Sequence, residues 1–167
     1  GKPQGSHYSL SFPLAGHSAV VCLSEREPEK KEMPLSLMRY NCLDAQGSVA
    51  LELSAEGDII TQEEYYPFGG TSLFSSRSES EADYKYHRYS NKERDNLTGL
   101  YDYGFRYYAP WLCRWISPDP LGIADGMNAY CMVRNNPVTY SDSAGLTSQT
   151  IELQELRPSS EYRRIAS

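Results

Sequence analysis

Two aspartates in the second half of the chain could act as an acid–base pair if the fold brought them together. Asp119 stands before Pro120, and Asp142 begins the run Asp-Ser-Ala-Gly-Leu that ends at Leu146. Two carboxylates about 3 Å apart cannot both ionise, so they share one proton. The ionised member can take a proton from water while the protonated member hydrogen-bonds the carbonyl under attack. Asp-Pro pairs and an Asp before Ser-Ala-Gly are also ordinary turn formers, so the residues alone leave both interpretations open.

The residues around these aspartates are rich in tyrosine, which indicates a β scaffold. Nine of the fourteen tyrosines lie between Tyr65 and Tyr108. Tyrosine favours strands, and it buries a large ring while keeping a polar tip. Residues 101–108 alternate like a single strand, in which Gly104 marks a bulge or a close backbone approach. We therefore expect a curved sheet with an aromatic inner face rather than a helical bundle.

Short apolar runs separated by glycine turns extend the β pattern towards the N-terminus. Residues 48–53 follow a turn at 44–47, and residues 59–61 follow a turn at 54–58. Such turns are typical of β-hairpins because glycine tolerates the positive φ that they need. The Ser- and Glu-rich stretch 75–83 predicts a loop or one helical turn. The predicted fold class is therefore mainly β, a sheet of hairpins with an irregular Tyr-rich segment.

The two ends of the chain differ in composition from this middle part. The charged, Pro-interrupted run at 24–32 cannot bury surface, so residues 1–36 are expected to form a poorly ordered leader. Residues 37–146 then form the core domain. Residues 147–167 are polar and far too few for a core of their own, which predicts a flexible C-terminal tail.

Composition argues against several classes of function. The net charge of −6 disfavours a general nucleic-acid binder, which needs clustered positive charge. No run approaches the roughly 18 apolar residues of a membrane span, and no signal peptide is recognisable. The four cysteines show neither a CxxC pair nor histidines at ligand spacing. The sequence therefore predicts neither a metal site nor a cofactor.

Three motifs give the chain a family resemblance. They are Arg-Trp-Ile-Ser-Pro-Asp-Pro at 114–120, Asn-Asn-Pro at 135–137 and Asp-Ser-Ala-Gly-Leu at 142–146. With them, residues 88–146 resemble the Rhs repeat-associated core, most closely the version in the C subunits of bacterial insecticidal toxin complexes. The run Tyr-Tyr-Pro-Phe-Gly-Gly-Thr at 65–71 is similar to the segment that enters this core. The resemblance implies a fragment of a β-shell built from YD-type hairpins that lean on their neighbours.

The same resemblance implies a self-cleaving aspartyl protease. Asp119 and Asp142 would form its dyad, and the cut would fall between Leu146 and Thr147. Because Asp142 lies four residues before this peptide bond, the chain itself would hold the substrate near the site.

Two further residues are candidates beside that dyad. Arg114 either supports the carboxylates electrostatically or packs on a neighbouring tryptophan by a cation–π contact. Asp125, in an Ala-Asp-Gly turn, is the reserve candidate for an acidic group.

Two functions therefore compete. In the first, the chain is an Rhs or toxin-complex C component that helps to enclose a toxin and cuts itself once after Leu146. In the second, the module is non-catalytic and residues 147–167 bind a partner. Ser143 favours the second because the family usually has Pro there. The expected partner is another shell-forming subunit or a chaperone, with homo-oligomers as an alternative. The resemblance also implies a bacterial protein that is made in the cytoplasm and secreted within a toxin assembly.

Overall fold

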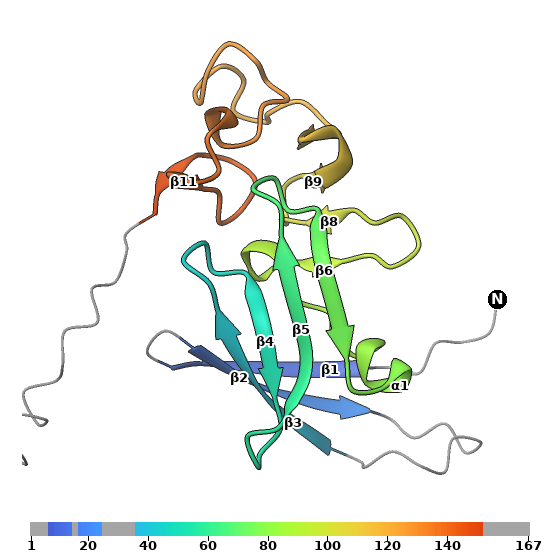
Figure 1. The fold of residues 1–167 in the computed structure, drawn as a ribbon. Helices are drawn as coiled ribbons and strands as arrows, with labels where there is room; N and C mark the ends of the chain where they lie inside the picture. The colour runs from blue at the N-terminus through green and yellow to red at the C-terminus, as the bar shows by residue number, and fades with distance from the viewer. Residues whose placement is uncertain (1–6, 15–16, 25–35, 152–167) are drawn as a thin grey trace, which may run out of the picture.

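A computed structural model describes residues 7–14, 17–24 and 36–151 of the chain. Its largest element is an antiparallel sheet of six strands, in which each strand pairs with the next one along the chain (Figure 1). In Figure 1, β1 runs across the direction of β5, so the sheet is strongly twisted. Its strands are β1 (His7–Leu14), β2 (His17–Ser24), β3 (Ser36–Leu43), β4 (Val49–Leu53), β5 (Ile59–Tyr65) and β6 (Thr71–Ser76).

Two tight turns connect the middle strands of this sheet. One carboxylate oxygen of Asp44 accepts a hydrogen bond from the amide of Ser48 at 2.7 Å, and Gly47 supplies a φ of +76°. The hydroxyl of Ser54 accepts from the amide of Asp58 at 3.3 Å in the next turn. β4 and β5 follow these two turns, which confirms the hairpin strands predicted from the sequence.

The middle strands also carry buried charges. Glu63 forms ion pairs with Arg88 at 2.6 Å and with Lys85 at 3.2 Å, and Arg39 pairs with Glu52 at 2.9 Å. Burial raises the pKa of Glu63, but the two neighbouring cations outweigh burial and leave that pKa below its usual value. Since loss of one partner would leave a buried charge unpaired, the two ion pairs of Glu63 fix residues 85–88 against the sheet.

Strand formation begins earlier in the chain than expected. β1 and β2 form a hairpin inside the segment predicted to be a poorly ordered leader, and β2 pairs with β3 from His17↔Cys42 to Leu23↔Ser36. The prediction gave weight to the charged run at 24–32, most of which lies outside the described residues. It overlooked the alternation of polar and apolar residues in β1, a period of two that is typical of strands.

Beyond the ends of β5 and β6 lies a smaller irregular unit, residues 89–151, which we call the cap (Figure 1). Before it, α1 (Glu79–Ala82) confirms the helical turn predicted within the Ser- and Glu-rich stretch. The cap contains two small antiparallel sheets, of order β10-β9-β8-β7 and β11-β12. Its elements are η1 (Tyr89–Asn91), β7 (Glu93–Arg94), β8 (Tyr101–Asp102), β9 (Tyr107–Ala109), η2 (Pro110–Leu112), β10 (Arg114–Trp115), η3 (Val133–Asn135), β11 (Tyr140–Ser141) and β12 (Gln149–Thr150).

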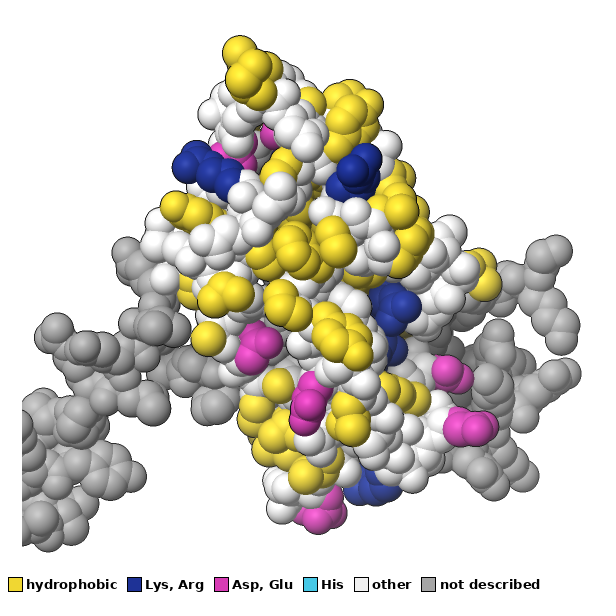
Figure 2. Space-filling view, turned by 45° about the horizontal axis from the view of Figure 1, so that its top comes forward, with side chains coloured by type: hydrophobic (Ala, Val, Ile, Leu, Met, Phe, Trp, Pro, Cys, Tyr) yellow, Lys and Arg dark blue, Asp and Glu magenta, His cyan; other side chains and the backbone are white. Residues whose placement is uncertain are grey.

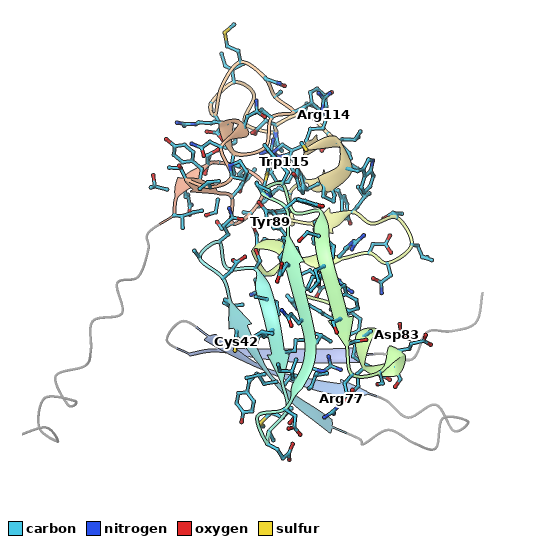
Figure 3. The ribbon with its side chains drawn as sticks, viewed as in Figure 1. Cys42, Arg77, Asp83, Tyr89, Arg114 and Trp115 are labelled. Atoms are coloured by element: carbon cyan, nitrogen blue, oxygen red, sulfur yellow. The ribbon has the colours of Figure 1, made fainter. Side chains whose placement is uncertain are left out.

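Aromatic rings form the core of the cap. Tyr89, Tyr101, Tyr103, Tyr108 and Trp115 are each at most 3% exposed. The ring of Trp115 meets Tyr103 edge-on at 4.9 Å between centroids and Tyr108 at 5.5 Å. Figure 3 shows Trp115 inside the cap and Tyr89 at its lower side, nearer to the large sheet. Burial raises the pKa of Tyr101 to about 12, so its hydroxyl remains a hydrogen-bond donor at neutral pH.

Three of these tyrosines attach the cap to the large sheet. The hydroxyls of Tyr89, Tyr108 and Tyr101 donate to the carbonyl oxygens of residues 67, 68 and 69 at 2.8, 2.8 and 3.2 Å. Gly69 permits this approach because a Cβ there would lie 2.6 Å from the ring of Tyr89. The φ of Gly69 is also +81°, which side chains disfavour. The tyrosines of the cap therefore dock onto the Pro-Phe-Gly-Gly segment.

Replacing Gly69 by alanine should weaken this joint. The strained φ and the clash with Tyr89 together should lower the free energy of unfolding by roughly 2–4 kcal/mol, measured by urea titration. Gly70→Ala is the matched control, because its Cβ would lie 3.6 Å from the Tyr66 ring and its φ is not in the left-handed region. That change should shift the unfolding free energy by less than about 1 kcal/mol. Equal losses in the two variants would contradict the proposed close approach.

Candidate active site

A hairpin in the cap presents the side chain on which the candidate site is built. Tyr101 pairs with Tyr108 across β8 and β9, and the amide of Tyr103 donates to the carbonyl of Arg106 at 3.1 Å. Gly104 turns the chain with a φ of +94°. Residues 101–108 were predicted to form a single strand, and that prediction is wrong. The apolar alternation continues through a tight turn, which a period-two pattern cannot distinguish from a straight strand.

The guanidinium of Arg106 contacts both predicted aspartates. One of its terminal nitrogens lies 3.0 Å from Oδ2 of Asp119, and the other lies 3.5 Å from Oδ2 of Asp142. The guanidinium carbon also lies 4.2 Å from the ring centroid of Trp115. Arg106, Asp119 and Asp142 are 3%, 9% and 3% exposed. Residues far apart in sequence are therefore held together by a buried cation with a planar fork of donors.

The loop that carries Asp142 is hydrogen-bonded along its whole length. Oδ1 of Asp142 accepts from the amides of Ala144 at 3.1 Å, Gly145 at 2.7 Å and Leu146 at 3.1 Å. Nε of Arg106 donates to the carbonyl of Gly145 at 2.6 Å. Gly145 has a φ of +74°, and a Cβ there would lie 3.1 Å from Cβ of Tyr103. The Asp-Ser-Ala-Gly-Leu motif thus folds into a loop that wraps one carboxylate oxygen.

Two more contacts hold the outer side of this loop. The ammonium of Lys92 donates to the carbonyl of Ser143 at 2.6 Å, and the amide of Phe105 donates to the carbonyl of Ala144 at 3.2 Å. Partial burial lowers the pKa of Lys92, against the opposing effect of the Asp142 carboxylate. Through its hydrogen bond to Ser143, Lys92 anchors the outer edge of the loop.

The predicted cleavage point follows directly after these anchored residues. Within the part of the chain that the structure describes, no hydrogen bond uses the carbonyl oxygen of Leu146 or the amide of Thr147. Leu146 is partly buried, and Thr147 is exposed. The peptide that joins them lies between a rigid loop and a residue, Ser148, that is itself hydrogen-bonded.

Arg114, the predicted supporting arginine, does not take that role. Its side chain is exposed, and among the described residues it enters no ion pair or aromatic contact. Only its backbone is engaged, with Ala109 in β10 and with Cys131 through an isolated bridge. Figure 3 places Arg114 at the outer side of the cap, away from Trp115. Arg114 and Trp115 are neighbours in β10, and neighbouring residues in a strand face opposite sides. Because Trp115 is buried in the core, the side chain of Arg114 points outward.

The sequence alone did not single out Arg106 as a site residue. One signal was present, because Arg106 stands alone in the aromatic run Phe-Arg-Tyr-Tyr. A charge in a stretch that must be buried needs an oppositely charged partner.

The other predicted residues lie elsewhere or show no special chemistry. Asp125 does not contact Arg106; it pairs with Arg134 at 2.9 Å. No cluster of three or more His, Cys, Asp or Glu side chains that could hold a metal ion occurs among the described residues. In the described ranges, no helix is both long and apolar enough for a membrane crossing.

Replacing Arg106 and Arg114 by methionine in separate variants should show which of the two stabilises the cap. Arg106→Met leaves two buried carboxylates without their cation, so the free energy of unfolding should fall by about 3–5 kcal/mol. Arg114→Met removes an exposed charge and should hardly change it. Both are measured by urea titration followed by tyrosine and tryptophan fluorescence. A larger loss in the Arg114 variant would show that the guanidinium of Arg106 is not the central contact.

Comparison with known proteins places this arrangement in a family. No protein-family model matches the chain. The toxin subunits YenC1 and YenC2 of Yersinia entomophaga are 47% identical over 132 residues and 56% identical over 99 residues. These matches cover 79% and 59% of this chain. The crystal structure of TcdB2-TccC3 superposes with a TM-score of 0.77 at 48% identity over 85% of this chain.

The chain belongs to the TccC-like, Rhs-associated C components of toxin complexes. It spans 13% and 10% of the lengths of YenC1 and YenC2, and 7% of the TcdB2-TccC3 chain. A structure of the Photorhabdus luminescens Tc holotoxin pore also matches, with a TM-score of 0.77 and 45% identity over 90% of this chain. The predicted family and the predicted mainly β fold with a Tyr-rich segment are thereby confirmed.

Proposed function

We propose that this chain belongs to a toxin-complex C component, that it forms part of a toxin-enclosing β-shell, and that it cuts itself after Leu146. In this view a core of residues 37–146 carries the protease, and residues 147–167 follow the cut. The observation that supports cleavage is the arrangement around Arg106. One guanidinium contacts Asp119, Asp142 and the carbonyl of Gly145, which is one residue before the bond to be cut.

The proposed chemistry is a single hydrolysis. One carboxylate takes a proton from a water molecule, whose oxygen adds to the carbonyl carbon of Leu146, while the other carboxyl hydrogen-bonds the carbonyl oxygen. The C–N bond to Thr147 then breaks, the nitrogen leaves with a proton, and Leu146 gains a new carboxyl group. A dyad holding one proton would carry no net charge together with Arg106, which is the state that burial favours. The anchored loop of Asp142 supplies proximity without a separate binding step.

Intact mass decides whether this reaction occurs. The purified chain, kept at neutral and at mildly acid pH, should lose residues 147–167, whereas Asp119→Asn and Asp142→Asn should stay whole because each removes one carboxylate of the dyad. Asp58→Asn, at an exposed position in the turn between β4 and β5, is the matched control and should cut like the wild type. A wild-type chain that stays whole for days would contradict the proposed cleavage.

The alternative is a non-catalytic module whose tail binds a partner. It is favoured by the pairing of β12 with β11, which ties the start of the tail to the cap, and by Ser143 in the place of the usual Pro. The wild type and both Asp→Asn variants would then each keep the mass of its own full-length chain.

The cap also exposes an apolar surface that supports a partner subunit. Figure 2 shows hydrophobic side chains gathered over the upper part of the molecule. Monomeric proteins seldom leave large contiguous apolar patches in water. A surface of this kind suits packing against the rest of a shell or against another subunit of a secreted toxin assembly. The most exposed large hydrophobic side chains of the cap are Met127 at 96%, Leu97 at 95%, Ile123 at 76%, Val138 at 71% and Phe105 at 65%.

Light scattering tests whether this apolar surface drives association. The isolated chain should self-associate as its concentration rises, and the double change Ile123→Glu and Met127→Glu should return it towards monomer mass by placing charges in the patch. Circular dichroism should show the same β signature for both proteins. A wild-type chain that stays monomeric throughout the titration would count against the partner surface.

A further inference from the structure

A second carboxylate, separate from the cluster around Arg106, holds the chain just beyond the proposed cut. Oδ2 of Asp125 accepts a hydrogen bond from the amide of Ser148 at 3.0 Å and another from the Ser148 hydroxyl. Its other oxygen accepts from Nε of Arg134 at 2.9 Å. The side chain of Asp125 is 13% exposed, so these bonds are partly shielded from water.

Arg134 is itself fixed in place. Its guanidinium lies over the ring of Tyr140 in β11, 5.5 Å from the centroid. It belongs to η3, where Val133, Arg134 and Asn135 all have positive φ, between +40° and +57°. Such backbone is retained only where the surroundings over-determine it. A continuous set of contacts therefore runs from β11 through Arg134 and Asp125 to Ser148.

The residues after Ser148 are held as well. Ser141 pairs with Gln149 and Tyr140 with Thr150, and the amide of Ile151 donates to the carbonyl of Thr139 at 2.8 Å. Residues 148–151 are thus bound to the cap one after another. The residue after β11 is Asp142, so this strand connects the anchored loop before the cut to the anchored segment after it.

The charge balance of Asp125 agrees with a holding role. Burial raises the pKa of Asp125, but the hydrogen bonds from Ser148 and Arg134 outweigh burial and leave that pKa below its usual value. The carboxylate is therefore ionised at neutral pH and accepts from all three donors.

We propose that Asp125 is a positioning residue that fixes the downstream side of the Leu146–Thr147 peptide and keeps the segment from Ser148 onwards bound to the cap after that peptide is cut. The part that concerns cutting rests on the proposed function. The part that concerns holding rests only on the contacts of Asp125. With both flanks anchored, the peptide between them has few conformations to search, which is the source of rate in an intramolecular reaction. Cleavage alone then leaves the downstream piece attached through hydrogen bonds and strand pairing.

The test compares Asp125→Ala, Asp125→Asn and Ser148→Ala with the wild type, in the full chain. Asp83→Ala, at an exposed position after α1, is the matched control. Hydrogen exchange of peptides covering 147–151, followed by mass spectrometry, should be about tenfold faster in Asp125→Ala and unchanged in the control. Asp125→Asn retains an oxygen that can accept from Ser148, so it should lose less protection than Asp125→Ala. The double variant Asp125→Ala with Ser148→Ala should be no worse than Asp125→Ala alone, because the hydroxyl acts through the carboxylate.

Cleavage is followed on the same samples by intact mass, and retention of the piece by native mass spectrometry. Asp125→Ala should cut about tenfold more slowly and lose the cut piece, with an unchanged melting temperature. Unchanged exchange at 147–151 in Asp125→Ala overturns the proposal whether or not the chain cuts. Equal cutting rates with faster exchange overturn the positioning role. If the wild type never cuts, the proposed protease fails and the exchange result alone decides whether Asp125 holds the segment.

Discussion

Burial of the Arg106 guanidinium is the constraint on which the cap depends. A cation with 3% exposure must be paired, and the partners named above come from two separate segments: the loop at Asp119, and the loop that carries both Asp142 and the carbonyl of Gly145. Trp115 closes the remaining face of the guanidinium. Because each partner is itself buried or hydrogen-bonded, the cation organises a region with little regular secondary structure.

The cap that holds this cation is joined to the large sheet beneath it. Tyrosine connects the two, because its ring packs in the cap while its hydroxyl reaches the turn between β5 and β6. The rings dock onto a turn that contains Gly69. This turn follows β5, the strand that carries Glu63 and its buried ion pairs. A hydrophobic contact alone would tolerate sliding of the cap, whereas directed hydroxyl contacts do not.

Much of the fold was predictable from local pattern. The turns after β3 and β4 follow from Asp, Ser and Gly at fixed positions, and the strands between them follow from apolar runs. Asp119 and Asp142 were selected through motifs, and the structure brings both to one guanidinium. The lone charge of Arg106 in an aromatic run was a signal, but its choice over Arg114 depends on which of the two side chains faces the core of the cap, and tertiary packing decides that. The hairpin at Gly104 was missed for a related reason, since alternation continues through a two-residue turn.

The pairing order of the six-stranded sheet has a consequence for assembly. Every strand pairs with its neighbour along the chain, so each hairpin can form as soon as its second strand has been synthesised. The cluster in the cap differs, because its carboxylates lie 13 and 36 residues beyond Arg106 in the sequence. No partial chain that stops before Asp142 can complete it. Synthesis therefore delivers the strands of the large sheet progressively and the buried ion-pair cluster of the cap last.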